Sequence, residues 1–462
     1  MPSTPCPFSF PFPDHPGLEP AAQYAELRQY AEPEQYAEPE RSADSGQSVE
    51  LRRSAEQGQP TGLRRSAEPG QHAEPEQSAE QGQPTEPEQS AELRRSAGQG
   101  RTPLVPVELP GGVPALLAHR HADACAVLTD PGFSREAATE LRMTSRSKES
   151  LALNVVDPPV HTRRRQLVAH AFTARQAGLA RPATERLAGE LIGAMVRKGP
   201  PADLVADFAL PLTMGVIGGI LGVPAPEQRR LHPWVEAMMS TTAYSPEEIA
   251  AAHKGVHGYF AGLLDAATDG LPGELAEHVR QGTLGRDEAV HLVSGLFIAG
   301  YETTGNQLGM CVLALLRHPL LLKRLRSDPA ATPQAVEELL RYTSLNAAGG
   351  VPHVALEDRP VGGTVVRAGQ VVVPVTDGAN RDPDVFDEPD LLDIDRPHNP
   401  HLSFGRGRHM CLGAGLARME LQVALDMLVA ELPGLGLAVP EDTLGWREGM
   451  YARGLLELPV RW

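Results

Sequence analysis

The chain has 462 residues, enough for a large core, and its 42 basic and 59 acidic side chains give a formal charge of −17. This balance argues against nucleic acid as a main partner, because phosphate binding needs a basic surface. The four cysteines are scattered without a CxxC pair, so we expect neither a zinc site nor a disulfide framework, and a reduced cytoplasmic compartment fits best.

Residues 29–100 differ in composition from everything after them. They are dominated by Glu, Gln, Ser, Ala, Pro and Arg, and their only Leu, Ile, Val or Phe residues are Val49, Leu51, Leu63 and Leu93. The unit Leu-Arg-Arg-Ser-Ala-Glu at 51–56 recurs at 63–68, without the apolar anchors that a solenoid needs. Such a segment buries too little apolar area to offset its ordering entropy, so we predict a disordered low-complexity insertion. An interaction tail is the alternative.

The chain shows no pattern typical of a membrane protein or a secreted protein. Its longest apolar runs, such as Leu292–Gly300, fall well short of the roughly 20 residues of a membrane span. The first residues lack a basic region followed by an apolar core, so we expect no signal peptide and no membrane partner.

From residue 101 the pattern becomes that of a folded domain. Leu104–Leu117 predicts a β-hairpin around Pro110-Gly111-Gly112, and Ala122–Leu128 predicts a short helix. Residues 134–155 are polar and irregular, which indicates a loop. Several helices are expected between 172 and 285, among them Ala174–Lys198 and Leu204–Leu221. An apolar set near Ser245-Pro246 is interpreted as ordinary core; it consists of Trp234, Met238, Met239 and Tyr244.

A basic helix is predicted after Pro158-Pro159. On it His161 and Arg165 are four residues apart and therefore share one face, which suits a carboxylate ligand. A solvated basic face is the alternative, and we favour it for Arg163 and Arg164.

A continuous helical pattern of 31 residues, about 46 Å long, covers Asp287–Arg317. Gly300 in its middle costs about 1 kcal/mol relative to Ala, so a packing or functional reason is expected, such as room for a flat ligand against the backbone. Thr303 is placed to donate back to a carbonyl of the preceding turn and open the helix locally.

A glycine-rich stretch, His401–Gly415, surrounds the cysteine nearest the C-terminus. Three glycines within nine residues permit a tight bend. Cys411 lies at the predicted start of the next helix, where backbone N–H groups and the helix dipole favour a thiolate, a candidate metal ligand. A buried structural cysteine is the alternative.

This stretch resembles the haem-binding loop of the cytochromes P450, Phe-Gly-x-Gly-x-His-x-Cys-x-Gly. The six matching positions are Phe404, Gly405, Gly407, His409, Cys411 and Gly413. The resemblance implies haem b as the cofactor, with Cys411 as the axial ligand of the haem iron. It also implies that Phe404, His409 and Gly413 contribute to haem binding.

Three further motifs resemble those of the family and occur in its order. Ala299–Thr304 matches the family's Ala/Gly-Gly-x-Asp/Glu-Thr-Thr/Ser pattern, which implies that Glu302 and Thr303 deliver protons during activation of O2. The pair His161 and Arg165 matches a His-x-x-x-Arg that binds a haem propionate. Glu338 and Arg341 match a structural Glu-x-x-Arg pair, with Arg396 as a third member of that network.

One position departs from the family pattern. An arginine that binds a propionate usually follows the turn that Gly349-Gly350 forms here, and this chain carries His353 instead. An imidazole can donate one hydrogen bond but lacks the charged fork of arginine. His353 is therefore expected as a weaker propionate ligand. Asn346–Gly349, just before it, is expected near the substrate pocket.

The resemblance implies a mainly α fold with a small β-region, the cytochrome P450 fold, over residues 101–462. Residues 1–28 resemble its N-terminal start. The implied activity is monooxygenation, in which a small organic substrate is hydroxylated or epoxidised in bacterial secondary metabolism. Ferredoxin and ferredoxin reductase are implied as electron donors, and Arg406 and Arg408 are candidates for meeting an acidic partner. Oxidative coupling without oxygen insertion and a non-catalytic haem sensor are the alternatives.

Overall fold

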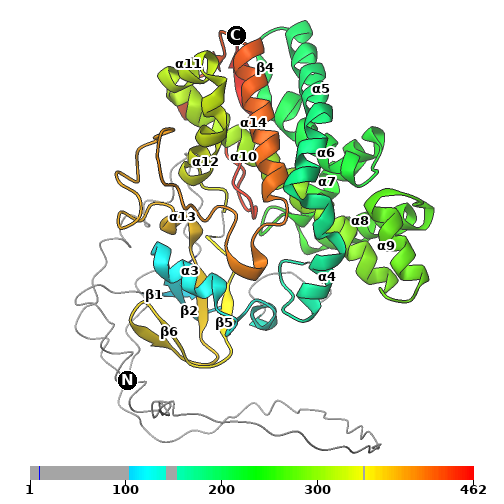
Figure 1. The fold of residues 1–462 in the computed structure, drawn as a ribbon, viewed down its shortest axis with the longest axis vertical. Helices are drawn as coiled ribbons and strands as arrows, with labels where there is room; N and C mark the ends of the chain where they lie inside the picture. Colours follow the sequence, from blue (N-terminus) through cyan, green and yellow to red (C-terminus); the bar gives the residue numbers. More distant parts are fainter. Residues whose placement is uncertain (1–9, 11–103, 142–152, 347–348) are drawn as a thin grey trace, which may run out of the picture. The chain divides into compact units, whose positions relative to one another are not determined.

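The computed structural model describes Phe10 and residues 104–141, 153–346 and 349–462 (Figure 1). Apart from Phe10, the expected N-terminal start at 1–28 and the expected insertion at 29–100 lie outside the described residues. Phe10 is buried, and its backbone N–H donates to the carbonyl of Glu108 at 2.9 Å.

Helices make up most of the described chain (Figure 1). They are α3 His121–Thr129, α4 Val160–Ala169, α5 Ala174–Lys198, α6 Leu210–Ile220, α7 Ala225–Met238, α8 Pro246–Ala266, α9 Gly270–Arg280, α10 Arg286–Arg317, α11 Pro319–Ser327, α12 Thr332–Tyr342, α13 Thr376–Ala379 and α14 Ala414–Glu431. Short 3₁₀ turns occur at Ala137–Leu141, His170–Phe172, Pro329–Ala331, Gly407–His409 and Glu441–Thr443, and a π-helical turn at Val205–Ala209.

The β-region consists of three small sheets. Its strands are β1 Val105–Leu109, β2 Val113–Ala118, β3 Phe133–Ser134, β4 Ala202–Asp203, β5 His353–Ala355, β6 Arg359–Val361, β7 Thr364–Val366, β8 Val371–Pro374, β9 Gly436–Leu437 and β10 Pro459–Arg461. The largest sheet has the order β1-β2-β8-β5-β3, in which only β2 and β8 are parallel. β4, β10 and β9 form a second sheet, and β6 pairs with β7.

Helix α10 passes through the main core and packs against α6 and α14. An ideal Cβ at Gly300 would lie 2.8 Å from Cγ1 of Ile217 on α6. Glycine at this position therefore lets two helices approach closely, which supplies the packing reason that the sequence required. Gly300 and Ile217 both line the cavity described below, which is consistent with the room expected beside Gly300.

Several sequence-based expectations are confirmed by these elements. The hairpin of β1 and β2 forms around Gly111 and Gly112, both at positive φ, and α5 has the predicted ends. The helical stretch expected at Leu204–Leu221 is present, although residues 205–209 are π-helical and α6 begins at Leu210. The expected loop at 134–155 includes the 3₁₀ turn Ala137–Leu141, and its residues 142–152 lie outside the described residues.

No single helix in the described part of the chain is long and apolar enough to cross a membrane. One pair, Val205–Ile220 with Ala225–Met238, meets that test of length and composition together, with a bend of 113° between its members.

A buried charge network joins α12 to the segment before the cysteine loop. The Glu338 carboxylate accepts hydrogen bonds from Arg341 at 2.7 and 2.8 Å and from Arg396 at 3.1 Å. The other donors of Arg341 reach the carbonyls of Asn380, Pro389 and Leu391 at 2.7–3.0 Å. The three side chains are almost completely buried, so the predicted structural role of this triad is confirmed by its contacts.

Replacing Glu338→Ala should therefore lower the free energy of unfolding by about 3–5 kcal/mol, because it leaves two buried guanidinium groups without their anion. Chemical denaturation of the purified holoprotein measures the change. Asp265→Ala is the matched control, since it breaks an exposed ion pair with Arg286 and should have little effect. Equal stability of the two variants would contradict a structural role for Glu338.

Candidate functional site

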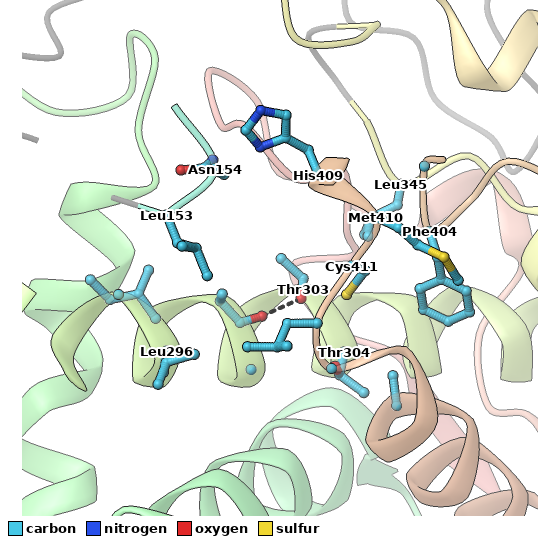
Figure 2. Close-up of a pocket in the computed structure, with 18 of the residues that line it drawn as sticks. Leu153, Asn154, Leu296, Thr303, Thr304, Leu345, Phe404, His409, Met410 and Cys411 are labelled. Atoms are coloured by element: carbon cyan, nitrogen blue, oxygen red, sulfur yellow. Dashed lines mark hydrogen bonds between the residues drawn. The ribbon is translucent and has the colours of Figure 1, made fainter. Parts of the chain in front are cut away.

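A cavity of about 500 Å³ lies between α10 and the glycine-rich loop at Phe404–Gly413 (Figure 2). Its walls are mainly apolar. The loop contributes Phe404, His409, Cys411 and Gly413; α10 contributes Leu296, Ala299, Thr303 and Thr304; and α4 contributes His161 and Arg165. Sequence segments more than 100 residues apart thus meet around one space.

The loop is fixed by its backbone. The N–H of Cys411 donates to the carbonyl of Phe404 at 2.8 Å. Gly407 has φ +73°, and a Cβ there would lie 2.4 Å from the carbonyl oxygen of Leu128, so only glycine lets the loop lie against the end of α3. Figure 2 shows the sulfur of Cys411 and the side chain of Thr303 directed into the same space.

The environment of Cys411 differs from the sequence-based expectation. Cys411 precedes α14 by three residues, and its exposed surface faces the cavity. Burial raises the pKa of the Cys411 thiol, and the backbone N–H of Gly413 and the nearby Arg165 oppose this only in part. The chain alone therefore does not favour a thiolate as predicted. A bound cation would supply the missing stabilisation, since thiolates are the ligand form.

Cationic and imidazole groups gather at one end of the cavity. The rings of His161 and His409 lie 4.4 Å apart, and none of their four nitrogens has a hydrogen-bond partner among the described residues. Burial lowers the pKa of both imidazoles, that of His161 to about 4. Arg165 makes no ion pair with a described residue. Buried polar groups normally have a hydrogen-bond partner, so the unpaired groups at this end of the cavity indicate a site for a bound anion.

Sequence analysis did not identify Arg135, which also lines this end of the cavity. It follows β3 and is 9% exposed. Its Nε donates to Nε2 of His353 at 3.1 Å, and its Nη1 donates to the carbonyl of Asn154 at 3.2 Å. No sequence signal could have found it, because only the pairing of β3 with β5 brings it to the site.

His353 itself is not brought to the cavity. Its Nδ1 lies 2.8 Å from the carbonyl of Val351, and its Nε2 accepts from Arg135, so both ring nitrogens are already engaged. Burial and the Arg135 charge lower the pKa of His353 to about 3. The neutral ring has no free N–H for a propionate, which corrects the expectation drawn from its place in the sequence.

The opposite wall is formed by α10. Thr303 Oγ1 donates to the carbonyl of Ala299 at 2.6 Å, as the sequence predicted, and this bond is the dashed line in Figure 2. The oxygen of Thr303 keeps its lone pairs for a group in the cavity. Asn346 lines the cavity as expected; Ala347 and Ala348 lie outside the described residues. Met238 and Met239 also line it, which corrects their interpretation as ordinary core.

Glu302 is adjacent in sequence but does not line the cavity. It is 1% exposed, and its Oε1 lies 2.7 Å from Nη1 of Arg447. Arg447 Nη2 donates in turn to Glu236 at 2.8 Å. Burial raises the pKa of the Glu302 carboxyl to about 7, although Arg447 opposes the shift. The structure thus separates the two expected catalytic residues, with Thr303 at the cavity and Glu302 in a buried ion pair.

These residues fit a haem group. Haem has a flat apolar body, a metal ion and two propionates. The cavity offers apolar walls, one cysteine thiol, and two unsatisfied imidazoles with the guanidinium groups of Arg135 and Arg165 at a single end. A second buried acid, Glu420 of α14, also lines the cavity, and burial raises its pKa well above its usual value.

The raised pKa of Glu302 predicts a pH effect on stability. Because the folded pKa of about 7 exceeds the usual 4.5, the contribution of Glu302 is fully present below about pH 4.5 and is lost as the pH rises through about 7. The free energy of unfolding of the wild type relative to Glu302→Gln should therefore fall across this window. Chemical denaturation at several pH values tests it, and a flat difference would contradict the raised pKa.

Comparison with known proteins gives one family. The Cytochrome P450 family pattern matches residues 263–432. The chain is 42% identical to nocardicin C N-oxygenase of Nocardia uniformis subsp. tsuyamanensis, over 78% of this chain and 92% of that protein. It is 41% identical to mycinamicin IV hydroxylase/epoxidase of Micromonospora griseorubida, over 79% and 94% of the two chains.

A solved structure agrees with this relationship. The crystal structure of the LnmA cytochrome P450 hydroxylase from the leinamycin biosynthetic pathway of Streptomyces atroolivaceus matches with a TM-score of 0.73. The identity is 43%, and the match covers 84% of this chain and 99% of that one. From this fold, this cavity and these relatives, the chain belongs to the cytochrome P450 family, as a monooxygenase with haem b as its cofactor.

Proposed function

We propose that this P450 inserts one oxygen atom into a small organic natural product, by hydroxylation or epoxidation, in bacterial secondary metabolism. The observation that carries the proposal is the placement of Cys411 and Thr303 on facing walls of one largely apolar cavity. That arrangement suits a cofactor ligand on one side and a proton-handling hydroxyl on the other.

The haem would be held from two directions. Cys411 would hold the haem iron through its thiolate, and a thiolate ligand would increase the reactivity of the cofactor toward O2. His161, Arg165 and His409 would bind the propionates, because all three line one end of the cavity and the buried ring nitrogens of both imidazoles lack a hydrogen-bond partner among the described residues. Phe404, packed under the guanidinium of Arg418 at 4.5 Å, and Gly413 would shape the loop around the sulfur. When bound, haem b activates O2 for transfer of an oxygen atom.

The chain's own part in the reaction is to supply protons and exclude bulk water. Thr303 would hold a proton at Oγ1, within the cavity. Glu302, with a pKa of about 7, is able to exchange protons near neutral pH. Because its carboxyl faces Arg447, transfer to Thr303 requires a linking water or a movement of the carboxyl away from that guanidinium.

The substrate would lie against the apolar wall formed by Leu153, Met238, Leu296 and Leu345. Two relatives are named for reactions on nocardicin C and mycinamicin IV, which are natural products. By this likeness we propose a substrate of the same broad kind, bound mainly by apolar contact.

The enzyme needs electrons from outside the chain, and we propose a ferredoxin with its reductase as the donor. Arg406 is exposed beside the cysteine loop, where a negatively charged partner would come close to the cofactor. Arg408 is less available, because it donates to the carbonyls of Phe133 and Pro131.

The free thiols of Cys125 and Cys311 accord with a cytoplasmic location.

Labelled dioxygen together with Thr303→Ala tests the proposed reaction. With a substrate found by spin-state difference spectra, the product should carry one labelled oxygen atom. In Thr303→Ala the rate of product formation should fall by about tenfold or more, with more reducing equivalents lost as hydrogen peroxide. Thr283→Ala, an exposed threonine on the loop before α10, is the control and should retain the wild-type ratio. A product without label would instead indicate oxidative coupling.

Arg406→Glu tests the donor surface. Reversing this exposed charge should raise the apparent KM for ferredoxin several-fold, and more strongly at low salt, without changing substrate binding. Steady-state kinetics at two ionic strengths measure both effects. Arg229→Glu, a charge reversal at an exposed site on α7, is the matched control. The same KM in all three proteins would exclude Arg406 from the donor surface.

A further inference from the structure

The register of the largest sheet pairs two side chains that are 218 residues apart. Strand β3 runs antiparallel to β5, with Phe133 opposite Ala355 and Ser134 opposite Val354. Continuing this register by one residue brings Arg135 opposite His353. The 3.1 Å hydrogen bond from Arg135 Nε to His353 Nε2 is the side-chain consequence.

Arg135 is a buried cation without a carboxylate in contact. Burial lowers its pKa to about 10, so it is still charged at neutral pH. Its described acceptors are one imidazole nitrogen and one carbonyl, both neutral, and its Nη2 donates to no described residue. A buried charge that is not paired within the chain is costly, which indicates that a bound anion completes the site.

The surroundings of Arg135 carry an excess of positive charge. Arg165 lines the same end of the cavity, together with the neutral imidazoles of His161 and His409, and the charge of Arg408 acts on Arg135 and on both imidazoles. Asp157 is the carboxylate that acts on Arg135, but Ser134 donates to it and it lies 3.7 Å from His409. The single carboxylate of Asp157, which already accepts a hydrogen bond from Ser134, cannot neutralise the positive charges of these three arginines.

His353 holds the guanidinium in place. Because Nε2 accepts from Arg135, its proton lies on Nδ1 and points to Val351, 2.8 Å away. The ring is thereby fixed at both nitrogens and acts as a rigid acceptor. Arg135 is held at Nε by His353 and at Nη1 by the carbonyl of Asn154, and it lines the cavity, so its Nη2 is left to bind a group there.

We propose that Arg135 is a cationic ligand of a haem propionate, and that His353 is a positioning residue which fixes the Arg135 guanidinium for this contact. The arginine thus comes from the end of β3 and its supporting imidazole from β5. In the family pattern described above, a single arginine at the position of His353 binds the propionate. The inference concerns retention of the cofactor and its potential; it stands independently of the substrate and the electron donor.

The test uses purified holoprotein and measures haem transfer to excess apomyoglobin and the ferric/ferrous reduction potential. Arg135→Ala should lose haem roughly 10- to 100-fold faster, as expected for a lost charge-assisted hydrogen bond. Its potential should fall, because removing a positive charge favours the ferric state. Arg181→Ala, the same change at a half-exposed site on α5, should match the wild type.

Position 353 provides the readouts that a merely structural role would not reproduce. His353→Leu removes the acceptor and should accelerate haem loss, whereas His353→Gln retains an acceptor and should restore most of the retention. In the double variant Arg135→Ala with His353→Arg, the new guanidinium on β5 should recover both haem retention and potential. This recovery would support a direct charge contact with the cofactor.

Two results would overturn the proposal. One is wild-type haem loss and potential in Arg135→Ala. The other is rapid haem loss in Arg135→Ala that His353→Arg does not repair, accompanied by an equal loss of stability of the apoprotein; Arg135 would then only hold β3 and Asn154 in place.

Discussion

The position of the cysteine loop depends on the buried carboxylate of Glu338. Arg341 and Arg396 neutralise it, and Asn399 donates to it at 3.1 Å, so α12 is tied to the segment that leads into the loop. The next contacts continue this attachment. His401 meets Glu337 at 3.1 Å, and Ser403 Oγ donates to the carbonyl of Leu340 at 2.7 Å. Cys411 therefore projects from a loop whose base is fixed by a charge network remote from the chemistry.

Against this fixed loop stands α10, which close packing holds in place. The close approach of Ile217 to Gly300 and of Leu210 to Gly305 brings α6 directly against the helix. The face that remains presents Ala299, Thr303 and Thr304 to the cavity. The two walls are thus set by different kinds of interaction, charge pairing on one side and close apolar packing on the other.

The distribution of charge around the cavity follows from burial. Burial keeps imidazoles such as that of His161 neutral, whereas the buried guanidinium group of Arg135 stays charged. The positive charge at this end of the cavity therefore comes from arginines and not from histidines. Glu302 is kept on the far side of α10, in contact with Arg447. A carboxylate at the cationic end of the cavity would oppose the binding of another anion there, and the position of Glu302 avoids this repulsion.

Local sequence patterns were sufficient for much of this structure. The long helix, the hairpin and the glycine loop each depend on neighbours in sequence, and Thr303 makes the predicted bond. Contacts set by tertiary packing were not predictable. Arg135 reaches the site only through strand pairing, His353 is turned away by it, and burial raises the pKa of Cys411 where helix position alone suggested the opposite. Met238 and Met239 were interpreted as core because they pack against the core, and only the tertiary structure shows that they also line the cavity.

We propose that Cys411 ligates the haem iron as a thiolate. The absorption spectrum of the ferrous carbonyl complex tests this ligation directly, in the wild type, in Cys411→Ala and in Cys125→Ala as a control at a free cysteine outside the cavity. The strongly red-shifted Soret band of a thiolate-ligated haem is expected in the wild type and in Cys125→Ala, and it should be lost in Cys411→Ala. Absence of that band from the wild type, or its persistence in Cys411→Ala, would show that Cys411 is not the ligand.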